Sequence, residues 1–396
     1  MIPATARDSM PLFQSFFMGG FECTSHIGLR GYRHDVLHAT RHDSRTKEDY
    51  LLLREIGVRT VREGLRWNAI ERRAGHYDFS SVLPMLHAAR DTGTQVIWDL
   101  MHFGIPDGLD VYSIAFVDRL EGLATAFSKV LCDFTDQPWL TPVNEISFTA
   151  FAAGDAGFFA PFQHGRGHDL KRQLVQATIA ATRTILAVAP HARLMQPEPH
   201  IHIVTARDRP WDAVAAANHR EAQFQTWDMI AGRFEPELGG AENLLDVIGV
   251  NYYPNNQWEH GGATLKLDDT RWRPFSSSLE EIATRYAPRP LIVSETGAEL
   301  ALRQPWLAYI GAQVERAIEG GANVQGICWY PILDHPGWDD DRHVRCGLYG
   351  FRRRGERRLE LDIAAELERW RVRLERSSRT QIGFTQLKAR SPESAC

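Results

Sequence analysis

Two glutamates each follow a short apolar run. Glu145 lies in T-P-V-N-E-I-S-F (141–148) and Glu295 in L-I-V-S-E-T-G (291–297). Charged side chains are seldom fully buried unless they are paired, so a carboxylate between Val143 and Ile146 requires a reason. Two carboxylates facing each other across a pocket can cleave a glycosidic bond, because one protonates the leaving oxygen while the other attacks or shields the anomeric carbon. The two glutamates are therefore the candidate catalytic pair.

Other polar and aromatic residues follow the remaining apolar runs. They are Glu22 and His26; Arg62, Glu63, Arg66 and Trp67; Asp99 and His102; Asn144; Glu198, His200 and His202; Asn251, Tyr252 and Tyr253; and Trp329, Tyr330, Asp334 and His335. An amide such as Asn144 can bind a sugar 2-OH, a contact that strengthens in the transition state. An arginine beside the nucleophile would lower its pKa, and a tyrosine hydroxyl would hold its orientation.

Several of these residues have a structural alternative. Trp329 and Trp338 can stack on a sugar face or fill the mouth of a barrel. Glu22 is expected to bind a sugar hydroxyl or to pair with an arginine. His26, Trp67 and His102 are expected to line the substrate pocket, where the alternative is a place in the core.

The elements that must position these residues are eight short apolar runs separated by helical patterns. The expected strands cover 16–21, 58–62, 95–100, 139–143, 192–196, 247–251, 291–294 and 326–330. Runs that are apolar throughout are typical of parallel strands buried on both faces. Eight βα units without a G-x-G-x-x-G turn favour a closed (β/α)8 TIM barrel over an open doubly wound sheet. The residues at the carboxyl ends of such strands form the active site.

The helical patterns carry their own boundary signals. The segment 46–57 begins with a Thr46 and Asp49 capping box and stops at Gly57, which predicts a capped helix. Similar patterns cover 80–93, 170–190 and 279–288. We expect a single catalytic barrel over residues 1–383, followed by a flexible C-terminal tail over 384–396.

The composition narrows the function classes. Hydrophobic residues at 43% allow a large core, and a net charge of −5 gives no electrostatic footprint for nucleic acid or a membrane surface. Five widely spaced cysteines without a C-x-x-C pair argue against disulfides and a zinc cluster. The N-terminus lacks the pattern of a signal peptide, and no apolar window approaches a membrane span. We expect a cytoplasmic protein with no cofactor or metal and a carbohydrate partner, and assembly into a homo-oligomer stays open.

At this point the sequence resembles retaining glycoside hydrolases of clan A, most closely the family 1 β-glycosidases, over nearly the whole barrel. The T-x-N-E-P of that family is similar to T-P-V-N-E-I, which implies that Glu145 is the acid/base. Its I-T-E-N-G is similar to V-S-E-T-G, which implies that Glu295 is the nucleophile. Its Y-R-F-S is similar to V-R-E-G, which implies that Arg62 lies beside the nucleophile.

Two further motifs complete an ordered set of five. L-Y-H-W-x-x-P is similar to L-M-H-F-G-I-P and implies that His102 binds a sugar hydroxyl. G-x-N-Y-Y is similar to G-V-N-Y-Y and implies that Asn251 lies in the pocket and that Tyr253 contacts the nucleophile. Each motif alone is weak, whereas the ordered set is specific.

The departures from this family lie around the catalytic pair. His26 replaces the early glutamine of the family, and Gly337 stands where the family has a sugar-binding glutamate after the last strand. Ile146 replaces the proline after the acid/base, and Thr296 replaces the asparagine after the nucleophile. The resemblance implies an intact catalytic pair in a rewritten sugar pocket.

The sequence therefore predicts a metal-independent retaining β-glycosidase. One alternative is a transglycosidase with the same pair, and another is a non-catalytic carbohydrate-binding barrel. A third is a metal-dependent hydrolase that uses His200, His202 and the acidic run 334–343. We favour salt bridges for that run, because metal ligands converge from fixed elements rather than from one loop. For Glu198, His200 and His202 we favour substrate contacts or structural pairing.

Overall fold

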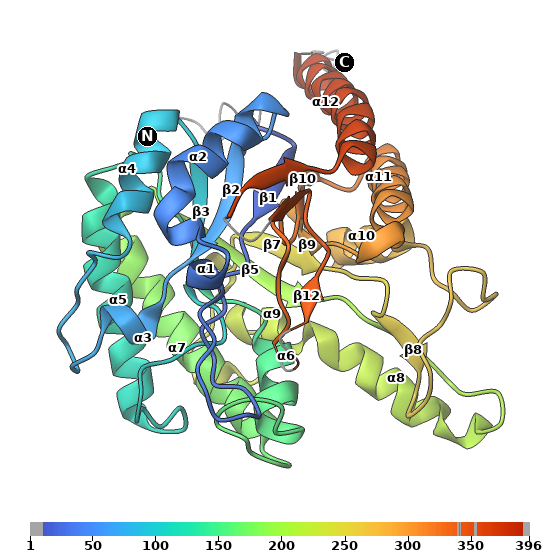
Figure 1. Ribbon diagram of the computed structural model, residues 1–396. Coiled ribbons are helices and arrows are strands. Elements are labelled where there is room, and N and C mark those ends of the chain that lie inside the picture. Colours follow the sequence, from blue (N-terminus) through green and yellow to red (C-terminus); the bar gives the residue numbers. More distant parts are fainter. Residues whose placement is uncertain (1–10, 339, 341, 352–354, 391–396) are drawn as a thin grey trace, which may run out of the picture.

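The computed structural model describes residues 11–338, 340, 342–351 and 355–390. Eight parallel strands close into a barrel in the order β1-β10-β9-β7-β5-β4-β3-β2 (Figure 1). These strands are β1 (Phe17–Gly20), β2 (Thr60–Gly64), β3 (Gln95–Met101), β4 (Trp139–Val143), β5 (Arg193–Pro199), β7 (Val247–Asn251), β9 (Leu291–Thr296) and β10 (Val324–Trp329). The predicted (β/α)8 TIM barrel is confirmed, and each of the eight apolar runs forms one of its strands.

Helices surround the barrel and connect successive strands (Figure 1). The longer ones are α2 (His42–Glu55), α4 (Leu83–Thr92), α5 (Ile114–Cys132), α7 (Gly167–Val188), α8 (Ala213–Glu221), α9 (Gln225–Ile230), α10 (Phe275–Arg285), α11 (Arg303–Glu319) and α12 (Leu361–Arg390). Short helices α1 (Val36–Ala39), α3 (Trp67–Ile70) and α6 (Ile146–Thr149) follow β1, β2 and β4. Within the described residues, no helix has the length and apolarity that a bilayer crossing requires.

The predicted start of the second helix is wrong. α2 begins at His42, four residues before Thr46, and the Thr46 hydroxyl donates to the His42 carbonyl from inside the helix. Asp49 accepts hydrogen bonds from Arg357 and contacts His42, so its carboxylate is used in a buried ion pair instead of a capping box. The predicted stop is close to the observed one, because the helix ends at Glu55 and Gly57 follows with a φ of 82°.

Three small two-stranded sheets lie in the loops outside the barrel. They pair β6 (His202–Val204) with β8 (Gln257–Glu259), β11 (His335–Pro336) with β12 (His343–Val344), and β13 (Tyr349–Phe351) with β14 (Arg357–Leu359). α12 packs beside α11 and runs through the predicted domain boundary at residue 383 (Figure 1). That boundary stays a prediction. The described residues do not include 391–396, which belong to the expected tail. They also do not include 1–10, where no signal peptide was expected.

The interior of the barrel is packed with side chains. Phe13 and Trp139, whose ring centroids are 4.6 Å apart, belong to an inner cluster with residues of the other strands. Gly20 leaves room for Tyr330, since a Cβ at Gly20 would lie 2.0 Å from the tyrosine ring. A filled interior is typical of this fold and leaves the loops at the carboxyl ends of the strands to form the functional face.

Candidate active site

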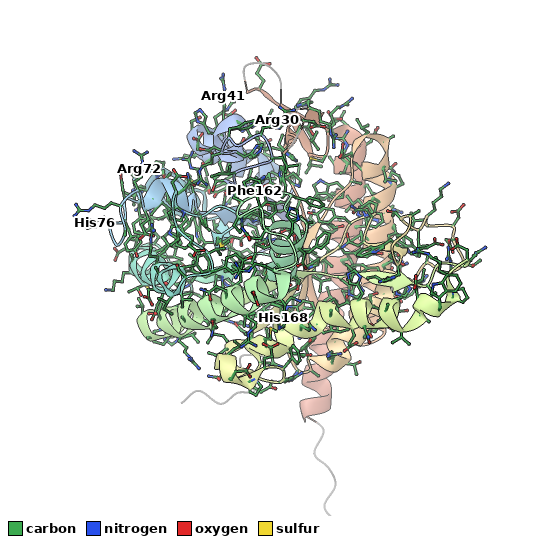
Figure 2. All side chains as sticks on the ribbon, turned by 90° about the horizontal axis from the view of Figure 1, so that it is seen from below. Arg30, Arg41, Arg72, His76, Phe162 and His168 are labelled. Carbon is green, nitrogen blue, oxygen red and sulfur yellow. The ribbon has the colours of Figure 1, made fainter. Side chains whose placement is uncertain are left out.

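A cavity of about 1300 Å³ lies at the carboxyl ends of the barrel strands. Its volume exceeds the 300–1,000 Å³ that is usual for small-molecule sites. The loops after the strands point downward in Figure 1, so Figure 2 views this end of the barrel and labels Arg30, Phe162 and His168 on it. The predicted site residues that line the cavity are Glu22, His102, Glu145, Tyr253, Glu295 and Trp338.

Glu295 lies at the end of β9 and is almost fully buried, with 4% of its surface exposed. The Arg62 guanidinium donates to its Oε1 from Nη1 at 2.9 Å. The Tyr253 hydroxyl donates to its Oε2, also at 2.9 Å. Both oxygens therefore accept hydrogen bonds, which fix the orientation of the carboxylate.

Arg62 connects this carboxylate to two neighbouring strands. Its Nη2 donates to Asp99 Oδ2 at 2.7 Å and to Asn144 Oδ1 at 3.0 Å. Burial disfavours the charged guanidinium, but the carboxylates of Asp99 and Glu295 hold the pKa of Arg62 well above its usual value. The arginine thus keeps a fixed positive charge beside Glu295 and orients the Asn144 amide.

Glu145 follows β4 in a left-handed backbone conformation, with a φ of 45°. Such a conformation is uncommon outside glycine, and strained residues of this kind gather at functional sites. The Asn251 amide donates to its Oε1 at 2.9 Å. Burial, and next the charge of Glu295, raise the pKa of Glu145 to about 8. Glu145 therefore holds a proton at neutral pH.

Glu198 holds the loop that carries Glu145. Its carboxylate, at the end of β5, accepts hydrogen bonds from the backbone N–H groups of Ile146 at 2.8 Å and Ser147 at 2.9 Å. Burial raises its pKa, although these donors oppose the rise. Of the two alternatives expected for Glu198, the structure shows structural pairing. Ser294, which sequence reasoning missed, donates to Asn251 Oδ1 at 2.6 Å and so orients the amide on Glu145.

His102, Glu22 and Trp338 form another part of the wall. His102 Nδ1 lies 2.9 Å from Asp99 Oδ2, and its Nε2 lies 3.3 Å from the Tyr330 hydroxyl. Glu22 Oε1 accepts a hydrogen bond from the Thr24 N–H at 3.0 Å. Among the described residues Glu22 has no ion pair, so the expected arginine partner is not found there.

Four predicted pocket residues do not line the cavity, and one of them, Asn251, is fully buried with its amide on Glu145. Trp67 is fully buried, and its indole N–H donates to Glu71 at 2.7 Å. Trp329 is equally buried, and its indole N–H donates to the Cys346 carbonyl at 3.0 Å. Both rings pack in the layer between strands and helices. His26 is 2% exposed and packs against the rings of Phe159 and Trp338. The expectations for Trp67 and Trp329 are corrected, because closeness to a strand end does not determine which side of the barrel a ring occupies. His26 and Asn251 are buried against cavity-lining side chains, Trp338 and Glu145, and do not line the cavity themselves.

Among the described residues, His200, His202 and the run 334–343 form no group of three side chains that could hold a metal ion. His200 is buried against the rings of Tyr252 and Phe275, and burial lowers its pKa to about 3. In the described part of the run 334–343, Arg342 pairs with Glu299 at 2.6 Å, and His343 lies 3.3 Å from Asp334. The favoured salt bridges are therefore present, while residues 339 and 341 lie outside the described residues.

No model of a known protein family matches the sequence. Among solved structures, the family 1 β-glucosidase from Thermotoga maritima has a TM-score of 0.73 at 15% identity, over 89% of this chain and 96% of its own. The β-glucosidase from the same organism in complex with deoxynojirimycin has a TM-score of 0.74 at 15% identity, over 90% and 98%. The AHE enzyme from Alicyclobacillus herbarius has a TM-score of 0.76 at 18% identity, over 91% and 98%. These likenesses show a shared fold.

Proposed function

We propose that this protein is a retaining glycoside hydrolase that acts on β-glycosides. One observation carries the proposal: Glu145 and Glu295 line one cavity in opposed environments. Burial and the charge of Glu295 raise the pKa of Glu145 to about 8, whereas Glu295 accepts hydrogen bonds from Arg62 and Tyr253. Two carboxyl groups with opposed environments define an acid and a nucleophile.

The reaction proceeds in two displacements. Glu295 attacks the anomeric carbon while Glu145 gives its proton to the leaving oxygen, which breaks the glycosidic bond and forms a glycosyl ester. Glu145, now ionised, takes a proton from water, and the resulting hydroxide oxygen attacks the anomeric carbon and releases Glu295. The charge on Glu145 changes in each step, and the Asn251 amide keeps its oxygen in place through both.

Asn144 and other residues of the cavity wall bind the sugar. The Asn144 oxygen accepts a hydrogen bond from Arg62 and its Nδ2 lies 3.5 Å from His102 Nε2, so one amide N–H is left for the 2-OH. His102, Glu22 and Trp338 line the same cavity and supply two polar groups and one aromatic face. The retained contacts of Arg62 and Tyr253 on Glu295 favour catalysis over a carbohydrate-binding barrel that has lost its activity.

The test uses a panel of aryl β-glycosides, including uncommon sugars. We expect at least one to be hydrolysed, with the β-anomer as the first product by NMR. Glu295→Ala should abolish turnover. Glu145→Ala should retain activity mainly on substrates with good leaving groups, because these need no protonation. Inversion at the anomeric carbon, or activity that survives Glu295→Ala, would contradict the proposal. Activity that requires a metal, shown by its loss in EDTA, would instead support the metal-dependent alternative.

The cavity volume favours one second candidate, a transglycosidase with the same pair. A cavity of about 1300 Å³ has room for an acceptor sugar beside the donor. In that case a sugar hydroxyl replaces water in the second displacement. Product analysis with an added acceptor glycoside distinguishes the two, since a transglycosidase forms a new glycoside where a hydrolase releases free sugar.

A further inference from the structure

The cavity continues past the catalytic pair along the helices that follow β4. In the proposed reaction Glu145 protonates the leaving oxygen, so the leaving group lies on the side of Glu145. α6 begins directly after Glu145, and Phe148 and Phe151 further along the chain both line the cavity. His168, labelled in Figure 2, and Lys171 line it from the first turns of α7. We call this part of the cavity the leaving-group arm, with the lining residues Phe148, Phe151, His168, Lys171, Gln225 and Trp258.

Contacts between helices hold Lys171 close to the start of α6. α7 packs against α6 and against the π-helical turn Ala150–Asp155 that follows it. The Lys171 ammonium donates to Gln225 Oε1 at 3.0 Å. The hydroxyl of the next residue, Thr226, lies 2.9 Å from the hydroxyl of Ser147, the second residue of α6. The lysine is therefore fixed beside the helical turn that begins at the proposed proton donor.

The charge of Lys171 has no ion-pair partner among the described residues, where its ammonium donates to a neutral amide oxygen. The carboxylates of Glu198 and Asp155 act on it from a distance, but Glu198 already holds two backbone N–H groups of α6 and Asp155 holds the first N–H of α7. Burial outweighs both charges and lowers the pKa of Lys171. The other basic residue of the arm, His168, pairs with Glu235 at 3.1 Å. An anionic ligand would compensate the buried ammonium.

The walls beside Lys171 include aromatic side chains. Phe148 is partly buried, while Phe151 is 50% exposed. His219, which also lines the cavity, packs against Trp258 with ring centroids 6.0 Å apart. Burial, and next the charge of a neighbouring histidine, lowers the pKa of His219 and favours its neutral form. An aromatic ligand can stack on such side chains. The single ammonium matches the one charge of a carboxylate better than the roughly two charges of a phosphate.

We propose that the leaving group of the substrate is an aromatic acid, with its ring against the aromatic side chains of the leaving-group arm and its carboxylate on the Lys171 ammonium. This inference rests on the proposed function, which assigns the arm to the leaving group. The bond that breaks is the glycosidic bond, Glu145 supplies the proton, and the acid leaves as a phenol that retains its carboxylate. Lys171 determines specificity and takes no part in bond cleavage.

The first test compares aryl β-glycosides of the sugar that the panel identifies. The 4-carboxyphenyl and 4-(2-carboxyvinyl)phenyl glycosides are each paired with the corresponding amide, which has a similar shape and no charge. In the wild type, kcat/KM should favour at least one carboxylate over its amide by about tenfold or more, chiefly through KM. The amide is the better leaving group, so chemistry alone would favour it. Glu145 acts on both members of a pair, so its titration cancels in the ratio. A ratio of one or less for both pairs would overturn the proposal.

Substitutions of Lys171 show whether this residue causes the preference. Lys171→Met removes the charge and keeps an unbranched side chain, so the ratio of carboxylate to amide should fall to about one. Lys171→Arg should restore most of the preference. Lys129→Met is the matched control and should keep the wild-type ratio, because Lys129 is an exposed lysine of α5 outside the cavity. A ratio that is the same in Lys171→Met as in the wild type would overturn the assignment.

A binding measurement separates this inference from the proposed function. Calorimetry with 4-hydroxybenzoate and 4-hydroxycinnamate, the acids that the two carboxylate substrates release, should show binding that Lys171→Met weakens by about tenfold. A protein that hydrolyses neutral aryl glycosides but has no preference for the carboxylates would contradict this inference and leave the proposed function standing. A protein that binds these acids through Lys171 but cleaves no glycoside would contradict the proposed function, and the arm would stand as a binding site for aromatic acids.

Discussion

Replacing Glu295 by glutamine should lower the pKa of Glu145. Burial is the first cause of the raised pKa, and the substitution leaves it in place. The second cause is the charge of Glu295, which the substitution removes. Two unit charges about 5 Å apart, the spacing of retaining enzymes, interact by about 3 kcal/mol at an effective dielectric constant near 20.

The neighbouring arginine reduces this effect. An interaction of about 3 kcal/mol corresponds to roughly two pKa units. Arg62, 2.9 Å from the Glu295 carboxylate, cancels part of the negative charge that Glu145 experiences. We therefore expect a net fall of about one unit, so that Glu145 titrates near neutral pH in the variant instead of at about 8.

The measurement is a direct titration, because Glu295→Gln should be nearly inactive. Glutamate labelled with ¹³C at the side-chain carboxyl is followed by NMR, and Glu145→Gln assigns the resonance. In the wild type, the same group should appear in kcat/KM for an aryl glycoside as a decline when the pH rises through about 8.

Another glutamate that lines the cavity, Glu299, provides the matched control. Glu299 pairs with Arg342 on a loop at the rim, so Glu299→Gln should leave the titration of Glu145 unchanged. The reasoning is refuted if Glu145 titrates at the same pH in Glu295→Gln as in the wild type. In that case burial alone would raise its pKa, and the two carboxyls would not face one glycosidic bond.

Three further predictions concern stability and positioning. The pKa of Glu145 is raised to about 8 in the folded state, so the wild type loses stability as the pH rises from the pKa of the unfolded chain to 8. Glu145→Gln lacks this titration and should be more stable than the wild type by about 2 kcal/mol at pH 9 in urea unfolding, with little difference at pH 4. Burial lowers the pKa of His42, but Glu63 and Asp49 raise it to about 9. The contribution of this histidine to the free energy of unfolding is full below the pKa of the unfolded chain and is lost as the pH rises through 9. In urea unfolding, His42→Gln should not show this loss. Glu198→Ala should leave two buried N–H groups unpaired, cost about 1–3 kcal/mol, and lower kcat most for poor leaving groups by displacing Glu145.

The barrel could be predicted from the sequence because its strands are buried on both faces. Strands such as 139–143 and 247–251 read as mostly apolar runs, and the helices between them place all eight in parallel. The helix boundaries were harder to predict. Thr46 and Asp49 have the spacing of a capping box, yet Asp49 pairs with Arg357, which lies 308 residues further along the chain. Local patterns carry no information about such distant partners.

The sequence predicts site residues well when their position at a strand end is enough to place them together. It does not predict them when the direction of the side chain decides the outcome. Glu145, Glu295, Arg62 and Tyr253 are brought together at the carboxyl ends of four strands. Trp67, at the start of α3, and Trp329, at the end of β10, have their rings buried in the core outside the barrel. A side chain near a strand end can point into the cavity or into the core, and an aromatic ring suits both environments.

The isoleucine that follows Glu145 has a structural role that a proline could not fill. A proline at position 146 would have no N–H, whereas the Ile146 N–H donates to Glu198 Oε1 at 2.8 Å. Glu198 is fully buried, so loss of this donor would leave a carboxylate with less to compensate its desolvation. The same hydrogen bond holds the residue that follows Glu145, whose left-handed backbone needs support from its neighbours. Ile146 and Glu198 therefore act as one unit that orients Glu145, the proposed proton donor.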